Sequence, residues 1–258
     1  MRRIWNASGT AALLATAAAL AMLAYMVGAL FLGPDPGWPP LTRASARAAS
    51  VNALLLSGLW TIVMAPLAAV MVTLRCRQAG TVAEWVSPLT RLAAAIACYV
   101  AMSAVIAIAL TNVQTAALAP IAFSHITLGT GMLAFAAVGV FFSAMLRDPL
   151  DASLASLAVT LTLGIGILVG GPAVSDLPRG IVNAALAGSP LVASAAAANI
   201  DLLRLDILYH VSPIAHFQFA YPSWYAAAGL YVASSLLLLG GSMLVVRTTG
   251  TRDERMVR

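Results

Sequence analysis

Six long apolar runs constrain the fold of this chain more than any other feature. They lie at about 10–32, 50–74, 92–111, 120–146, 153–174 and 224–246. An α-helix rises 1.5 Å per residue, so about twenty apolar residues cross the ~30 Å hydrocarbon core of a bilayer. Only 9% of the 258 residues are charged, which is far below the value typical of soluble domains. The sequence therefore predicts an all-α membrane protein with six transmembrane helices in one domain, 1–258.

The distribution of arginine predicts the orientation of these helices. All 14 basic residues are Arg, and the chain contains no Lys. With the N-terminus inside, ten Arg fall in cytoplasmic segments and four fall outside. The positive-inside rule then places both termini in the cytoplasm and the chain in a plasma membrane. Because the Arg residues are scattered at the ends of apolar runs, nucleic acid is not an expected partner.

The sequence contains neither an ATP-binding motif nor charged residues within the spans that could couple transport to an ion gradient. A phosphate-binding P-loop needs a Lys, and none is present. The predicted spans contain no Asp, Glu, Lys or Arg between their ends, which disfavours coupling to a proton or ion. Gly164, Gly166 and Gly170 lie inside an apolar span, where the Gly166-x-x-x-Gly170 pair predicts close helix packing. We therefore expect a non-enzymatic protein that depends on a partner for energy.

Three histidines leave two alternatives open. His210 and His216 are six residues apart with Pro213 between them, so one helix face cannot present both. His125 lies near the outer end of the fourth span, where a hydrogen-bonded structural role is favoured over a relay. One alternative is a membrane anchor of a redox complex that uses His125 and His216 for haem or quinone. The other is an ion-coupled carrier. We predict no metal site and free thiols at Cys76 and Cys98.

The connection between the second and third spans, 75–91, carries its own helix signals. Thr81 and Glu84 form a T-x-x-E capping box after Gly80, and Ser87 with Pro88 offers a second helix start. We expect a short amphipathic helix parallel to the membrane here.

The other connections differ in character. The proline-rich segment 33–49 predicts a hydrophilic connector, and Asp148-Pro149 predicts the start of the fifth span. The segment 175–223 is too polar to span, and Ser189-Pro190 predicts a helix start within it. We expect short external amphipathic or re-entrant helices before the last span.

Several side chains in or near the spans carry further predictions. A kink is expected at Pro66 in the second span. Aromatic residues gather before the sixth span as an interfacial belt, and hydroxyl and amide side chains are expected to bond between helices. The aromatic residues are Tyr209, Phe217, Phe219, Tyr221, Trp224 and Tyr225, and the polar residues are Asn52, Thr61, Asn112, Gln114, Ser124, Thr127 and Thr130.

Two stretches of the sequence resemble the ABC-2 family of exporter permeases. The first runs from the second span into the loop 75–91, and the second is the SPIAHF segment before the last span, which is similar to the gliding-motility-associated branch. Two features depart from the family pattern: Arg75-Cys76 replaces the usual acidic pair, and the Glu and Pro are each displaced by about one residue. The matching residues are Pro66, Met71, Arg77, Gly80, Thr81, Glu84, Ser87 and Pro88 in the first stretch, and Ser212, Pro213, His216 and Phe217 in the second.

The resemblance implies a six-helix, type V exporter-like fold in a bacterial inner membrane. It also implies a dimer of permease subunits, identical or related, above two ATPase subunits that bind ATP and magnesium. The loop that includes Trp85 would form the coupling helix that docks on the ATPase, so this chain would hold no cofactor of its own. Nothing in the resemblance names the transported substrate.

Overall fold

The computed structural model is a helical bundle. It describes residues 16, 19–24, 27, 43–73, 82–111, 118–146, 148–169, 177–202 and 220–256, and these residues form helices and no strand. Five helices are long and apolar enough to cross a membrane, and a bent pair of short helices gives a sixth if the pair is counted as one span. The chain is therefore a multi-pass membrane protein, and its described residues contain five to six candidate membrane-spanning helices.

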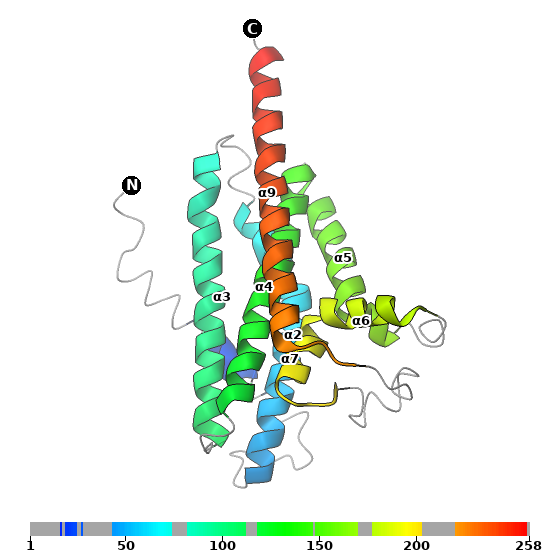
Figure 1. Ribbon diagram of the computed structural model, residues 1–258. Helices are drawn as coiled ribbons and strands as arrows, with labels where there is room; N and C mark the ends of the chain where they lie inside the picture. Colours follow the sequence, from blue (N-terminus) through cyan, green and yellow to red (C-terminus); the bar gives the residue numbers. More distant parts are fainter. Residues whose placement is uncertain are drawn as a thin grey trace.

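The five long helices run in alternating directions (Figure 1). Helices α2, α4 and α9 point one way, and α3 and α5 point the other way. The α2–α3 connection, the α4–α5 connection and the end of α9 thus share one end of the bundle, which we call the Thr73 end after the last residue of α2. The bounds are α2 Arg43–Thr73, α3 Val82–Thr111, α4 Leu118–Met145, α5 Pro149–Val169 and α9 Trp224–Met256.

Several observed helices extend beyond the predicted spans. Helix α2 begins at Arg43, inside the predicted connector 33–49, because the Ala-rich segment 43–49 favours helix. Helix α9 continues to Met256, ten residues beyond its predicted end. Of the first predicted span, 10–32, the described residues are all helical, and Ala21 and Ala24 are fully buried.

The third helix corrects one expectation. Helix α3 begins at Val82, directly after the Thr81 of the predicted capping box, and continues through Pro88 to Thr111. Ser87 and Pro88 therefore do not start a helix. From Val82 onward the loop forms the first turns of the third span, and no separate membrane-parallel helix is found among residues 82–91. Proline is tolerated here because neighbouring groups in a membrane bundle can satisfy the carbonyl it frees.

Helix α4 lies at the centre of the bundle and contacts α2, α3, α5 and α9. In the most apolar segment of α4, 67% of the residues are buried inside the bundle, whereas in the corresponding segment of α9 only 11% are buried. Gly129, Gly131 and Gly139 lie where neighbouring helices come close to α4. Small residues of this kind allow close contact between helices in lipid, where burial of apolar surface gives no driving force. The other helices therefore pack around α4.

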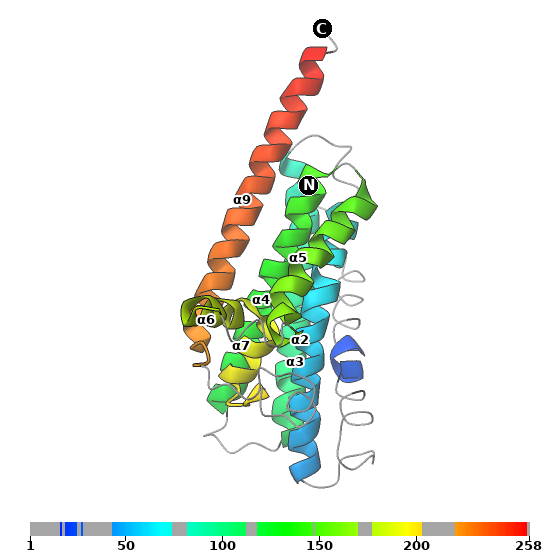
Figure 2. The ribbon, with the colours of Figure 1, turned by 90° about the vertical axis from the view of Figure 1, so that its right-hand side faces the viewer.

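The predicted short helices before the last span are present as a bent pair. Helix α6 (Arg179–Gly188) and helix α7 (Pro190–Ala197) meet at an angle of 84°. Helix α6 lies across the bundle near the end of α5 and the start of α9 (Figure 2). Ser189 is the N-cap of α7 and accepts a hydrogen bond from the Val192 amide, with Pro190 at the first helical position. The prediction from Ser189-Pro190 is confirmed.

Helix α7 is buried among the long helices. Its residues Pro190 to Ala195 are all buried and belong to, or adjoin, a core built with α2, α4 and α9. The Ser189 hydroxyl donates a 2.6 Å hydrogen bond to the Gly164 carbonyl of α5. The Tyr231 hydroxyl of α9 donates a 2.8 Å hydrogen bond to the Ala187 carbonyl of α6. These two bonds attach the bent pair to the helices on either side of it.

Candidate functional site

The residues of the predicted coupling loop lie at the Thr73 end. Glu84, Trp85, Ser87 and Pro88 lie on the first two turns of α3. Arg77, Gly80 and Thr81 lie outside the described residues. So does the second predicted motif, Ser212, Pro213, His216 and Phe217.

Trp85 does not point outward, as a docking residue would. Its side chain is 2% exposed, whereas the next residue, Val86, is 49% exposed. Trp85 belongs to a buried cluster that includes Ala69 of α2 and Val140 of α4. Its indole Nε1 has no hydrogen-bond partner, and it is the only such buried side-chain atom in the described part of the chain. Trp85 therefore anchors the start of α3 in the bundle.

The last described residue of α2 is a second anchor. Thr73 is fully buried, and a 2.7 Å hydrogen bond joins its Oγ1 to the Ser143 Oγ of α4. Thr73 and Trp85 therefore fix the end of α2 and the start of α3 in the bundle. Both residues take part in contacts among α2, α3 and α4, so a displacement of these two helix ends would act on the central helix.

Polar side chains inside the bundle are mostly bonded within their own helices. Thr61, Thr127 and Thr130 each donate to the carbonyl four residues earlier, at 2.8, 2.8 and 2.9 Å. Ser124 donates to the Ile121 carbonyl. The prediction of bonds between helices is therefore wrong for Thr61, Ser124, Thr127 and Thr130. A hydroxyl in an apolar helix finds its nearest acceptor in the preceding turn. Asn112 and Gln114 lie outside the described residues.

Different hydroxyls make the contacts between helices. The Tyr99 hydroxyl of α3 lies 2.6 Å from Ser57 Oγ of α2, and Trp60 lies beside the Tyr99 ring with 6.3 Å between ring centroids. Sequence reasoning missed both Tyr99 and Ser57. Two hydroxyl side chains within apolar spans were the available signal, but a single sequence does not show that they face each other, because it does not give the rotation of one helix against another.

His125 has the environment of a structural histidine. Its Nδ1 lies 2.7 Å from the Ile121 carbonyl oxygen, which can only accept, so Nδ1 carries a hydrogen and donates it. In the neutral ring Nε2 then accepts from the Ser103 hydroxyl of α3, 3.2 Å away. Both ring nitrogens are thus engaged by the protein itself. His210 and His216 lie outside the described residues, which contain no cluster of three or more metal-ligating side chains.

The aromatic belt is partly described. Trp224 at the start of α9 stacks on Phe123 of α4, with 4.3 Å between ring centroids and 4° between ring planes. Tyr225 packs edge-on against Trp224 and is 67% exposed. Tyr221 donates a hydrogen bond to the Asp201 carboxylate. Tyr209, Phe217 and Phe219 lie outside the described residues.

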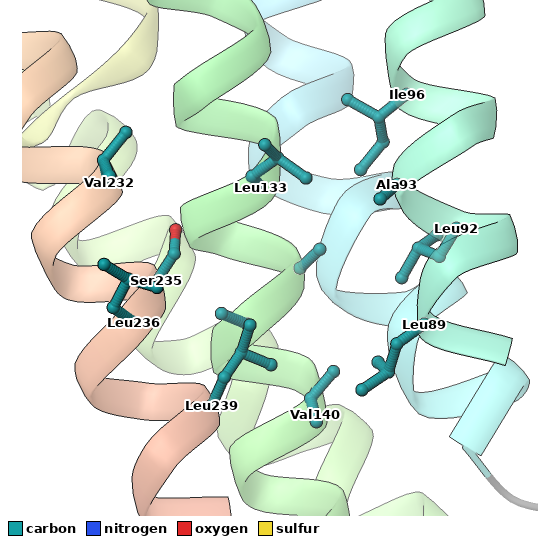
Figure 3. Close-up of a pocket in the computed structure, with 12 residues that line it drawn as sticks. Leu89, Leu92, Ala93, Ile96, Leu133, Val140, Val232, Ser235, Leu236 and Leu239 are labelled. Carbon is teal, nitrogen blue, oxygen red and sulfur yellow. The ribbon is translucent and has the colours of Figure 1, made fainter. Parts of the chain in front are cut away.

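An apolar groove runs between α3 and α9 with α4 as its floor (Figure 3). Its volume is about 240 Å³, and it lies in the half of the bundle nearer the Thr73 end. The one polar side chain in it is Ser235, whose hydroxyl donates to the Tyr231 carbonyl. We call this feature the α3–α9 groove. Its lining is Leu89, Leu92, Ala93 and Ile96 of α3, Leu133, Ala136, Ala137 and Val140 of α4, and Val232, Ser235, Leu236 and Leu239 of α9.

No protein-family model matches this chain, and comparison with curated proteins gives no match either.

Proposed function

We propose that this chain is the permease subunit of an ATP-binding cassette exporter of the ABC-2 type. The proposal starts from the two motif resemblances and from a layout of long helices with a bent pair of short helices before the last one. The orientation that follows from arginine places the Thr73 end in the cytoplasm. At that end an ATPase dimer would bind the subunit and supply ATP and Mg²⁺.

The observation that carries the proposal is the burial of Thr73 at the end of α2 and of Trp85 at the start of α3. Both side chains are packed in the bundle around α4. A partner that displaced these two helix ends would therefore also move the central helix. This arrangement suits a subunit that receives mechanical work at one end, as alternating-access exporters do.

The charges of the spans agree with an external energy source. Within the five long candidate spans that the structure describes, the Asp, Glu, Lys and Arg residues are Arg91, Asp151 and Arg247, and all three lie toward the Thr73 end. None occupies the middle of the bundle, where an ion-coupled carrier usually holds its coupling residue. His125 is engaged at both ring nitrogens, so no observation favours the haem anchor.

The buried α7 supports a role for a second permease subunit. Helices α4 and α7 fill the interior of the single chain, so a path through one subunit would require their displacement. A path between two copies, or between this chain and a related permease, leaves both packed. We therefore include a second permease subunit in the proposed assembly.

The test is co-purification with an ATPase subunit from native membranes in mild detergent. We expect an ATPase carrying a G-x-x-x-x-G-K-[ST] motif, and we expect Val86→Phe to reduce its recovery about tenfold, the effect of ~1.4 kcal/mol. The matched control is Val105→Phe, the same change at an exposed position near the other end of α3. Absence of any ATPase, or equal loss in both variants, contradicts the proposal. A Soret band in the pure protein would indicate the haem anchor instead.

A further inference from the structure

The α3–α9 groove has walls that suit hydrocarbon. Eleven of its twelve lining residues are Leu, Ile, Val or Ala, and the hydroxyl hydrogen of the twelfth, Ser235, is used within α9. Leu236 is 67% exposed and Leu133 is 38% exposed, so the groove opens to the outside of the bundle. In a membrane such an opening faces lipid or another membrane helix.

The groove has a volume of about 240 Å³ and apolar walls, which suit a segment of a hydrocarbon chain. A single hydrocarbon chain is narrow enough to lie between α3 and α9.

A charged side chain lies beyond the groove at the Thr73 end. Arg247 is exposed on α9 and lies eight residues after Leu239. This spacing places Arg247 about 12 Å further along the helix axis than Leu239 and about 80° away from it around the axis. The groove thus leads from the apolar part of α9 toward a guanidinium near the membrane surface. Arginine binds phosphate through paired hydrogen bonds, and basic residues next to apolar clefts favour anionic head groups.

We propose that the α3–α9 groove binds an acyl chain of an anionic phospholipid from the leaflet at the Thr73 end, with Arg247 binding its phosphate. The nearby Arg91 is not part of the site. Arg91 lies between two groove-lining residues in the sequence, Leu89 and Leu92. Because each residue of an α-helix is rotated by 100° from the one before, Arg91 lies about 150° around α3 from the face that lines the groove. The inference does not depend on the exporter proposal, because its test involves no ATPase.

The experiment uses the full chain in nanodiscs of phosphatidylcholine that contain a phosphatidylglycerol probe with a photoreactive acyl chain. We expect cross-links on peptides of α3 and α9, and competition by unlabelled phosphatidylglycerol but not by added phosphatidylcholine. Arg247→Gln should lower labelling about fivefold, the effect of losing one surface charge worth ~1 kcal/mol, while Arg91→Gln should leave labelling unchanged.

A second pair of variants tests the groove itself. Ala93 and Ala97 are both exposed on α3, but only Ala93 lines the groove. Ala93→Phe should abolish labelling of α9, and Ala97→Phe should not. The proposal is overturned if the two variants behave alike, or if phosphatidylcholine competes equally. It is also overturned if Leu236→Cys, in a background with Cys76→Ser and Cys98→Ser, forms a disulfide-linked dimer in membranes, since a second copy would then occupy the groove.

Discussion

Gly139 of α4 lies directly against the backbone of Pro66 in α2. A β-carbon at position 139 would lie 2.2 Å from the Pro66 carbonyl oxygen and 2.9 Å from its carbonyl carbon, distances that real β-carbons do not adopt. Helix α2 passes through Pro66 without ending, although proline donates no hydrogen bond to the carbonyl of Ile62. A close contact between α2 and the central helix therefore coincides with a missing backbone hydrogen bond in α2.

Gly139→Ala should destabilise the bundle because the obstructing atoms belong to backbone and cannot rotate away. We expect a loss of about 1–3 kcal/mol, measured as a lower midpoint in unfolding by SDS titration. Gly240→Ala is the control, because a β-carbon there meets no atom within 4 Å. Equal destabilisation by the two substitutions would contradict the packing described here.

Ser189→Ala should weaken the attachment of the bent pair. The substitution removes the N-cap of α7 together with the 2.6 Å bond to the Gly164 carbonyl. Loss of a cap costs about 0.5–2 kcal/mol, and we expect a lower thermal midpoint in detergent. Ser153→Ala serves for comparison, because its hydroxyl is exposed and bonds only its own helix at Pro149. A midpoint unchanged by Ser189→Ala would argue against a role for the cap.

Thr73 and Ser143 should be energetically coupled. A double-mutant cycle with Thr73→Val and Ser143→Ala isolates their 2.7 Å hydrogen bond. Interhelical bonds in membrane proteins average about 0.6 kcal/mol and reach about 1.7 kcal/mol, and we expect a coupling energy in this range. Strictly additive effects of the two substitutions would show that α2 and α4 are not joined at this point.

Trp85 should tolerate loss of its N–H but not of its ring. Trp85→Phe keeps most of the buried aromatic surface and removes an indole nitrogen that has no partner, so stability should change little. Trp85→Ala should cost about 3–5 kcal/mol, as truncation of buried aromatic residues does. The comparison is made by fluorescence-detected size-exclusion chromatography after heating. Similar thermal stability of the two variants would place the ring outside the core.

Local signals predicted several helix boundaries well. Asp148 precedes Pro149, the first residue of α5, and its carboxylate accepts a 2.7 Å hydrogen bond from the Leu150 amide. Ser189 and Pro190 start α7 as expected, and α3 begins at Val82, directly after Thr81 of the predicted capping box. These boundaries depend on contacts within one turn, so the residues that determine them are adjacent in the sequence.

Long-range packing decided what the sequence left open. The Gly166-x-x-x-Gly170 pair predicted close packing, yet a β-carbon at Gly166 meets only Thr162 of its own helix, and Gly170 lies outside the described residues. Gly164 is the residue that packs closely, against Ile62 of α2. Which glycine faces a neighbour depends on helix rotation, and a uniformly apolar helix gives no amphipathic pattern from which to read it.

The sequence by itself determined three properties. It showed that this chain is a membrane protein, it gave the positions of the apolar runs, and it showed at which ends of the spans most arginines lie. Those properties follow from the hydrophobic length and the charge of contiguous segments. Only the tertiary structure decided that Trp85 points inward, that α7 is buried beside α4 and that α3 and α9 leave a groove between them. In lipid nearly every face of these helices is apolar, so shape and hydrogen bonding choose the neighbours, and both require the assembled bundle.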